Sequence, residues 1–234
     1  MKRFFHSELE AFRSTLVLMG ERAIEIVRLA TQALIEGRIE LCEEALQQDD
    51  AIDQLELRID NEGLRYISLR APVATELRLV AIGMKAGQNL ERVGDEACTI
   101  AKRTRELLSE IPPRSLHHIP RMAELTIEML RDAIGCLVDE DSEKARLLPN
   151  RDNEVDALHR ENYRQLSAIL AREPENVASH LHLIFISKSL ERIADHATNL
   201  AEEAIFLYRG EDLRHAPEIK AASSGTLKQS PPPL

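Results

Sequence analysis

The sequence is poor in the residues that sheets and turns require. Only 9 of its 234 residues are glycine, aromatic residues make up 3%, and tryptophan is absent. Strands favour aromatic and β-branched residues, and turns use glycine. Leucine, alanine, glutamate and arginine are plentiful instead, and these residues lose little conformational freedom in a helix. The composition therefore predicts an all-α fold.

Long apolar runs and paired cysteines are lacking as well. No apolar run reaches about 18 residues, so we expect no membrane-spanning helix and no direct membrane insertion. The segment from Met1 to Glu8 has no apolar stretch behind its basic pair and is not typical of a signal peptide. Cys42, Cys98 and Cys136 form no CxxC pair, which excludes a zinc ribbon or a disulfide framework. We therefore expect a cytoplasmic protein in reducing surroundings.

Positive charge is in deficit. The chain has 30 Lys and Arg against 40 Asp and Glu, which gives a formal net charge of −10. Binding of nucleic acid or anionic lipid needs clustered positive charge, so no nucleic-acid partner is expected. The sequence also contains no Walker loop, GxGxxG, GxSxG or HExxH motif. The paired Glu-x-x-His motifs of a ferritin-like di-iron oxidase are absent too. We therefore predict that the protein is not an enzyme.

Proline and glycine divide the chain into six long segments with helical periodicity. Helices are predicted at 7–36, 39–69, 72–109, 115–140, 142–172 and 174–208. Ser7 and Glu10 have the spacing of a capping box at the first start, and Gly37 and Gly210 mark two of the ends. Short connections force neighbouring helices to run antiparallel. The pattern predicts two tandem up-down-up three-helix bundles.

The two halves of the chain repeat one another. Residues 19–56 match 122–159 at an offset of 103, with 11 of 38 positions identical. Residues 90–101 match 190–201 at an offset of 100, with six of twelve identical. This is an internal duplication. It predicts one bundle at 1–111 and a second at 112–214, followed by a disordered Ser/Pro-rich tail at 215–234.

Carboxylate pairs with a spacing of four residues recur at matching positions of the two halves. Residues i and i+4 lie on the same face of a helix. If the second and third helices of a bundle pack side by side, their pairs converge into an oxygen-rich cluster. Hard or borderline cations such as Mg²⁺, Ca²⁺, Mn²⁺ or iron favour such clusters, whereas a merely solvated face has no reason to keep carboxylates at matching positions. The candidate metal ligands are Asp49, Asp53, Glu91, Asp95, Asp152, Asp156, Glu191 and Asp195.

Further polar side chains adjoin these pairs. Glu56 extends the first acidic stripe by three residues, and its repeat counterpart is His159. Cys98 extends the stripe on the third predicted helix in the same way. We interpret all three as neighbours of the candidate site and not as ligands. Arg92 and Arg192 follow the acids in sequence and point elsewhere on the helix, so we expect each to pair with a carboxylate on another helix.

These motifs resemble the PhoU family. The segments 49–56, 71–78 and 90–95 are similar to the first half of a PhoU-family protein, and 190–202 is similar to the family's second signature. The resemblance covers about residues 5–210. Glu76 stands where the family usually has aspartate, and His182 stands at the second-half counterpart of Arg78.

The resemblance implies an accessory and regulatory protein of bacterial phosphate uptake. Such proteins act beside the phosphate ABC transporter and its ATPase subunit, and they restrain a phosphate-sensing histidine kinase when phosphate is plentiful. In some members the E/D-x-x-x-D pairs bind multinuclear iron or other metal clusters. The expected cofactor is therefore an iron cluster, with zinc, manganese, magnesium and nickel as alternatives, and a homodimer is expected. Two other interpretations remain open: a carboxylate bundle that stores or oxidises iron, and a metal-free helical adaptor.

Overall fold

The computed structural model describes residues 2–109, 115–170 and 176–211. Within these ranges the chain is helical almost throughout and contains no strand. The prediction of an all-α fold is confirmed. The helices are α1 (Lys2–Glu36), α2 (Ile39–Gln47), α3 (Asp49–Arg70), α4 (Ala74–Ser109), α5 (Ile119–Asp139), α6 (Ser142–Ala145), α7 (Leu148–Leu170) and α8 (Val177–Arg209).

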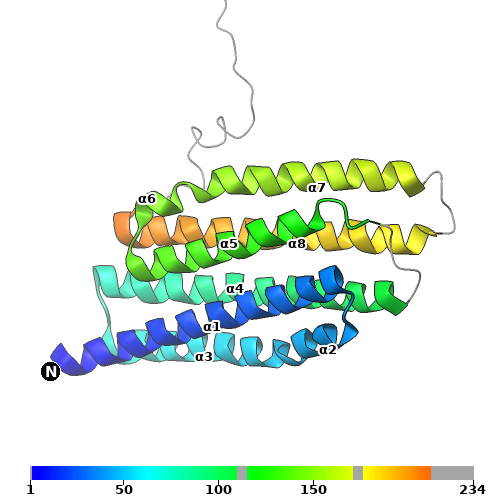
Figure 1. The fold of residues 1–234 in the computed structure, drawn as a ribbon. Helices are drawn as coiled ribbons and strands as arrows, with labels where there is room; N and C mark the ends of the chain where they lie inside the picture. Colours follow the sequence, from blue (N-terminus) through cyan, green and yellow to red (C-terminus); the bar gives the residue numbers. More distant parts are fainter. Residues whose placement is uncertain (1, 110–114, 171–175, 212–234) are drawn as a thin grey trace, which may run out of the picture.

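The helices form two three-helix bundles that lie lengthwise against each other. The first bundle contains α1, α3 and α4 with the short α2, and the second contains α5, α7 and α8 with the short α6. Figure 1 shows α3 and α7 on opposite outer sides of the molecule. Helices α4 and α8 form the most extensive contact between any two helices. The predicted pair of duplicated bundles is confirmed, and α4 and α8 join them.

The predicted limits of the two units remain a prediction. The boundary near residue 111 falls within 110–114, and the predicted junction at 172–174 falls within 171–175. Both segments lie outside the described residues, as does the predicted tail at 215–234.

Two of the six predicted helices are divided. The helix predicted at 39–69 is divided at Gln48 into α2 and α3, and the one predicted at 142–172 is divided into α6 and α7. Pro149 accounts for the second division, because proline has no N–H to donate to the preceding turn. At the first division Asp49 and Asp50 form the first turn of α3, where the positive end of the helix dipole favours carboxylates. Both divisions lie shortly before a predicted ligand pair.

The predicted glycine ends are found, whereas the first predicted start is wrong. Gly37 (φ 67°) and Gly210 (φ 71°) follow α1 and α8 in the left-handed conformation, which costs glycine no steric strain. Helix α1 begins upstream of Ser7, so Ser7 lies inside the helix and no capping box forms there. Helices α4 and α5 begin later than predicted, at Ala74 and Ile119.

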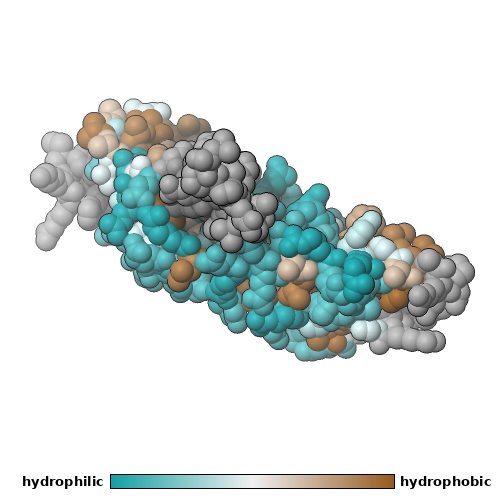
Figure 2. All heavy atoms as spheres, turned by 90° about the horizontal axis from the view of Figure 1, so that it is seen from above, coloured by the Kyte–Doolittle hydropathy of each residue, from teal (hydrophilic) through white to brown (hydrophobic). Residues whose placement is uncertain are grey.

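One apolar core runs through both bundles, and its burial pattern repeats with the sequence. Ile52 and Val155, which are 103 residues apart, are both fully buried, and so are Ile59 and Asn162. The outer face above α7 is hydrophilic along most of its length, with hydrophobic residues near its ends (Figure 2). None of the described helices is long and apolar enough to span a membrane.

Candidate metal centres

The first carboxylate cluster forms where α3 packs against α4. Asp49 and Asp53 lie on α3, and Glu91 and Asp95 lie on α4. Burial raises the pKa of Asp53, and the negative charges of Asp49 and Asp95 raise it further. Burial and the charge of Asp95 likewise raise the pKa of Glu91, with a smaller contribution from Asp53. The two predicted pairs therefore converge across the helix contact.

The second cluster forms in the same way between α7 and α8, and it is more deeply buried. Burial, followed by the charges of Asp195, Asp156 and Glu191, raises the pKa of Asp152 to about 7. Burial and the charge of Glu191 also raise the pKa of Asp195. One carboxylate oxygen of Asp152, Oδ1, is buried without a hydrogen-bond partner among the described residues. An unpaired buried oxygen is costly, and a cation at this position would stabilise it.

A basic side chain lies against each cluster. In the first, the Arg92 guanidinium contacts Glu91 at 3.3 Å and Asp95 at 3.2 Å. In the second, the Lys188 ammonium pairs with Glu191. Lys188 was not predicted from the sequence. The prediction that Arg92 pairs with another helix is wrong, because Arg92 bridges the acidic pair of its own helix. These two basic side chains compensate part of the negative charge of the clusters.

A line of polar contacts joins the two bundles beside the clusters. Arg192 on α8 contacts Glu96 on α4 at 2.8 Å, so the prediction that Arg192 pairs with another helix is confirmed. His196 Nδ1 lies 2.9 Å from Asn89 Oδ1, and Asn89 Nδ2 donates to Glu203 at 3.2 Å. Burial lowers the pKa of His196. These contacts fix α4 and α8 relative to each other.

A second set of polar residues stands behind the second cluster, inside the core. His159 Nδ1 lies 2.9 Å from Ser187 Oγ, and Asn162 Nδ2 donates to the same hydroxyl at 3.2 Å. Asn162 Oδ1 accepts from the backbone N–H of His118 at 3.0 Å. Burial lowers the pKa of His159. Asn162 and Ser187 were not predicted from the sequence. The signal that could have identified them is the contrast with their repeat counterparts, Ile59 and Gly87, which are apolar or lack a side chain.

Cys98 lies beside the first cluster. Burial, followed by the charge of Asp49 and a contact with that carboxylate, raises the pKa of the Cys98 thiol to about 12. A thiol of this kind stays protonated at neutral pH and is a poor metal ligand, because the thiolate is the ligating form.

The donor chemistry of both clusters fits a hard or borderline cation, whereas the side-chain positions do not yet enclose one. Within the described ranges, no three His, Cys, Asp or Glu side chains form a group that could hold a metal ion as they lie. Carboxylate oxygens are nevertheless the ligands that such cations prefer. The Arg92 and Lys188 side chains already supply part of the positive charge that a bound metal ion would provide. Metal ligation by the eight predicted carboxylates remains a prediction.

The fold and the clusters define a class: a duplicated helical-bundle protein with one carboxylate cluster in each repeat. The family model described as the PhoU domain matches residues 16–104 and 119–204. The chain belongs to the PhoU family.

Several relatives cover most of the chain. The phosphate-specific transport system accessory protein PhoU homolog of Aquifex aeolicus is 37% identical over 215 residues, covering 92% of this chain and 96% of that protein. The homolog of the same name from Pseudomonas aeruginosa is 35% identical over 212 residues, covering 90% of this chain and 88% of that protein.

Solved structures agree with the fold. The crystal structure of PhoU from Pseudomonas aeruginosa has a TM-score of 0.86 at 34% identity and covers 88% of this chain and 100% of that one. The phosphate transport system regulatory protein PhoU from Streptococcus pneumoniae has a TM-score of 0.81 at 26% identity and covers 89% of this chain and 99% of that one.

Proposed function

We propose that this protein is an accessory and regulatory protein of bacterial phosphate uptake that acts in the cytoplasm by contact and not by catalysis. Membership of the PhoU family supports this proposal, as do relatives named as accessory proteins of the phosphate-specific transport system. The structural observation that carries it is the pair of matching carboxylate clusters, one on each repeat. The proposed action is negative regulation of phosphate-starvation signalling.

The proposed partners are the ATPase subunit of the phosphate ABC transporter and the phosphate-sensing histidine kinase, and the proposed assembly is a homodimer. The relatives named as accessory proteins of the phosphate-specific transport system support a partner in the transporter. The unit limits at 1–111 and 112–214 are part of the same proposal, with one PhoU repeat in each.

The proposed role of the clusters is to hold metal ions, iron first, with zinc, manganese, magnesium and nickel as alternatives. Bound metal would neutralise mutually repelling carboxylates and fix the relative positions of α3 and α4, and of α7 and α8. The raised pKa values of Asp53 and Asp152 support this role, because they reflect negative charge that lacks full compensation.

Elemental analysis of the untagged protein, purified without chelator, tests metal binding. The comparison protein carries Glu91→Ala, Asp95→Ala, Glu191→Ala and Asp195→Ala. We expect metal in the parent and its loss in the variant. Absence of metal from both proteins, even after incubation with added ions, would contradict metal binding and leave the regulatory proposal to be tested separately.

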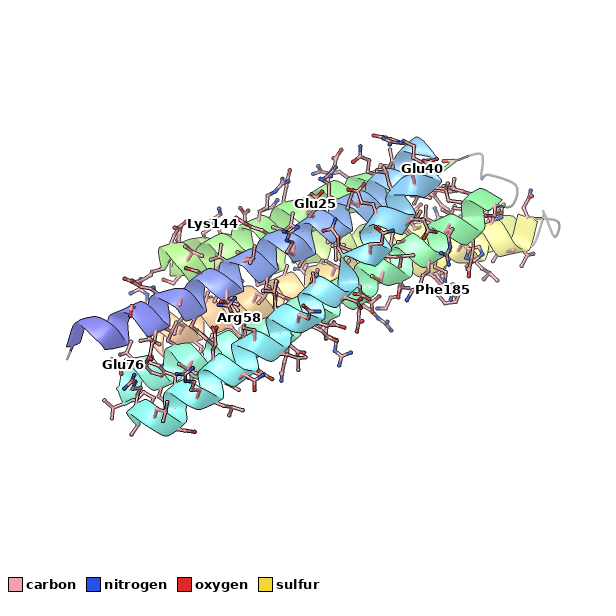
Figure 3. All side chains as sticks on the ribbon, turned by 90° about the horizontal axis from the view of Figure 1, so that it is seen from below. Glu25, Glu40, Arg58, Glu76, Lys144 and Phe185 are labelled. Carbon is pink, nitrogen blue, oxygen red and sulfur yellow. The ribbon has the colours of Figure 1, made fainter. Side chains whose placement is uncertain are left out.

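Regulation is tested in cells with a phosphate-starvation reporter. Glu91→Ala with Asp95→Ala should raise reporter expression in phosphate-rich medium towards its starved level. The matched control is Glu40→Ala with Glu44→Ala, an exposed pair with the same spacing on α2, the helix on which Figure 3 labels Glu40. Expression that stays repressed in the first variant would contradict a regulatory role for the cluster.

A metal-free adaptor is the second candidate, and the position of Arg92 favours it for the first bundle. Because Arg92 bridges Glu91 and Asp95, that cluster is partly neutralised without an ion. In this case the Glu91→Ala and Asp95→Ala variant would alter regulation while the parent protein contains no metal.

A further inference from the structure

We propose that the outer face of α3 pairs with the same face of a second copy of this chain, with the two helices antiparallel and a two-fold axis close to Asn61. The residues of this face are Leu57, Arg58, Asn61, Glu62 and Leu64. This inference rests on the proposed homodimer and deepens it, because it assigns the surface and the orientation of the contact.

Two large apolar side chains of α3 are exposed to solvent. Leu57 is 58% exposed and Leu64 is 56% exposed. They are seven residues apart, so they lie on one face of the helix at a spacing of about 10 Å. Figure 1 shows α3 on an outer side of the molecule, where a second chain can reach it. Burial of both leucines against a second copy would remove apolar surface from water, which favours association.

The polar neighbours of these leucines are arranged about the same midpoint. The midpoint of Leu57 and Leu64 falls next to Asn61, and so does the midpoint of Arg58 and Glu62. A two-fold axis at this point would place Leu57 against Leu64 of the second copy. It would also place Arg58 near Glu62 of the second copy and bring the two Asn61 side chains together. An isologous interface requires this kind of reciprocal contact, in which residue i meets residue j and j meets i.

The side chains that would meet are complementary in chemistry. Arg58 and Glu62 carry opposite charges and already pair within the helix at 2.7 Å, so two such pairs side by side attract each other. Asn61 Nδ2 donates to the backbone oxygen of Leu57 at 2.7 Å. An amide has a second N–H and an acceptor oxygen, which can bond to the amide of the second copy. A parallel pairing would instead place Arg58 against Arg58, and like charges repel.

The equivalent positions of α7 lack this arrangement. Ile52 of α3 and Val155 of α7, which are 103 residues apart, are both fully buried, so the two helices pack in the same register. At that offset the counterparts of the five α3 residues are Arg160, Glu161, Arg164, Gln165 and Ser167. The bundle thus accepts polar residues where α3 has leucines. The leucines are not needed for packing within the bundle, which favours a contact outside it.

Sedimentation velocity measures the dimer Kd at protein concentrations from about 1 µM to about 1 mM, which covers the affinities of weak and standard interfaces. The test variant carries Leu57→Arg and Leu64→Ser, the residues that α7 has at these positions. We expect a dimer in the parent protein. The variant should raise the dimer Kd at least about tenfold, because it removes four leucines from the contact.

The matched control is Leu181→Ser with Phe185→Ser, which removes two exposed apolar side chains from α8 instead. It should leave the dimer Kd within about twofold, since residues outside a contact contribute little to it. Circular dichroism confirms that each variant is folded.

Disulfide cross-linking tests the orientation of the two helices. The native cysteines are buried, so a cysteine introduced on the outer face is the reactive one. With oxidised glutathione as the oxidant, Asn61→Cys should cross-link two copies. Ser68→Cys should not, because antiparallel helices would place its two sulfurs about 20 Å apart.

Each result decides a separate point. A parent protein that stays monomeric at every concentration would overturn both the homodimer and this inference. A dimer that Leu57→Arg with Leu64→Ser leaves unchanged would overturn the inference while the homodimer stands, and weakening by the α8 control alone would assign the contact to α8. Equal cross-linking of Asn61→Cys and Ser68→Cys would overturn the antiparallel orientation.

Discussion

The two carboxylate clusters share one plan of helices and differ in their surroundings. In the first, the Arg92 side chain is 63% exposed and that of Asp95 is 51% exposed, so water screens much of their interaction. In the second, the Glu191 side chain is 14% exposed, against 20% for its counterpart Glu91. The clearer difference is a buried oxygen of Asp152 that lacks a hydrogen-bond partner among the described residues. The duplicated backbone sets where the carboxylates stand, and the side chains around them set how strongly their charge destabilises the fold.

The cores behind the clusters differ as well. Ile59 packs on Gly87 in the first bundle, whereas Asn162 donates to Ser187 in the second. A polar group is tolerated in a core only when its hydrogen bonds are made. A buried polar group should therefore destabilise the first core more than the second.

Exchanging the two buried residues should give the largest effect. Ile59→Asn should reduce the free energy of unfolding by about 3–5 kcal/mol, because it removes apolar burial and leaves an amide without partners beside Gly87. Asn162→Ile should reduce it by about 1–3 kcal/mol, because it leaves Ser187 and the His118 N–H with one partner fewer. Urea unfolding of both variants measures the difference. Equal losses would contradict the contrast between the cores.

The second-largest difference between the clusters should appear in the pH dependence of stability. The ordinary pKa of an aspartate is 3.8, and that of Asp152 in the folded protein is about 7. Between these values the folded state binds more protons than the unfolded state, so stability falls as pH rises from about 4 to about 7. Asp152→Asn should flatten this dependence and stabilise the metal-free protein at pH 7 by about 1–2 kcal/mol, since neighbouring carboxylates share the titration.

Thermal unfolding in the presence of a chelator, followed across this pH range, tests that dependence. Glu40→Gln is the control, because Glu40 is an exposed residue on α2 that belongs to neither cluster, and such changes stay within about 0.5 kcal/mol. An unchanged slope in Asp152→Asn would show that the stability loss arises elsewhere.

Removing the basic side chains Arg92 and Lys188 should give the smallest effect on stability, and it compares the burial of the two clusters directly. Lys188→Gln should destabilise the metal-free protein by about 1 kcal/mol, since its partner Glu191 is mostly buried. Arg92→Gln should cost less than about 0.5 kcal/mol, because that guanidinium is mostly in water. Chemical unfolding with chelator present measures both values. A larger loss for Arg92→Gln would contradict the assignment of the second cluster as the more deeply buried one.

Helical periodicity and duplication were sufficient to predict the all-α fold, the two bundles and the convergence of the acidic pairs. They did not predict the division at Gln48, because no proline or glycine marks it. Nor did they predict that Arg92 folds back onto its own pair, since that choice depends on side-chain rotamers and solvent. The Asn162 and Ser187 contacts depend on which faces of α7 and α8 meet, which spacing along a single helix leaves undetermined.

The divisions in the outer helices have a mechanical consequence. Helices α4 and α8 are continuous along the molecule, with a rise of about 1.5 Å per residue. The outer helices are divided instead, at Gln48 and between α6 and α7. Asp49 follows the division at Gln48 directly, and Asp152 lies in the second turn of α7. Each cluster thus spans one continuous helix and one divided helix, and the division leaves the divided helix with fewer backbone hydrogen bonds next to its carboxylates.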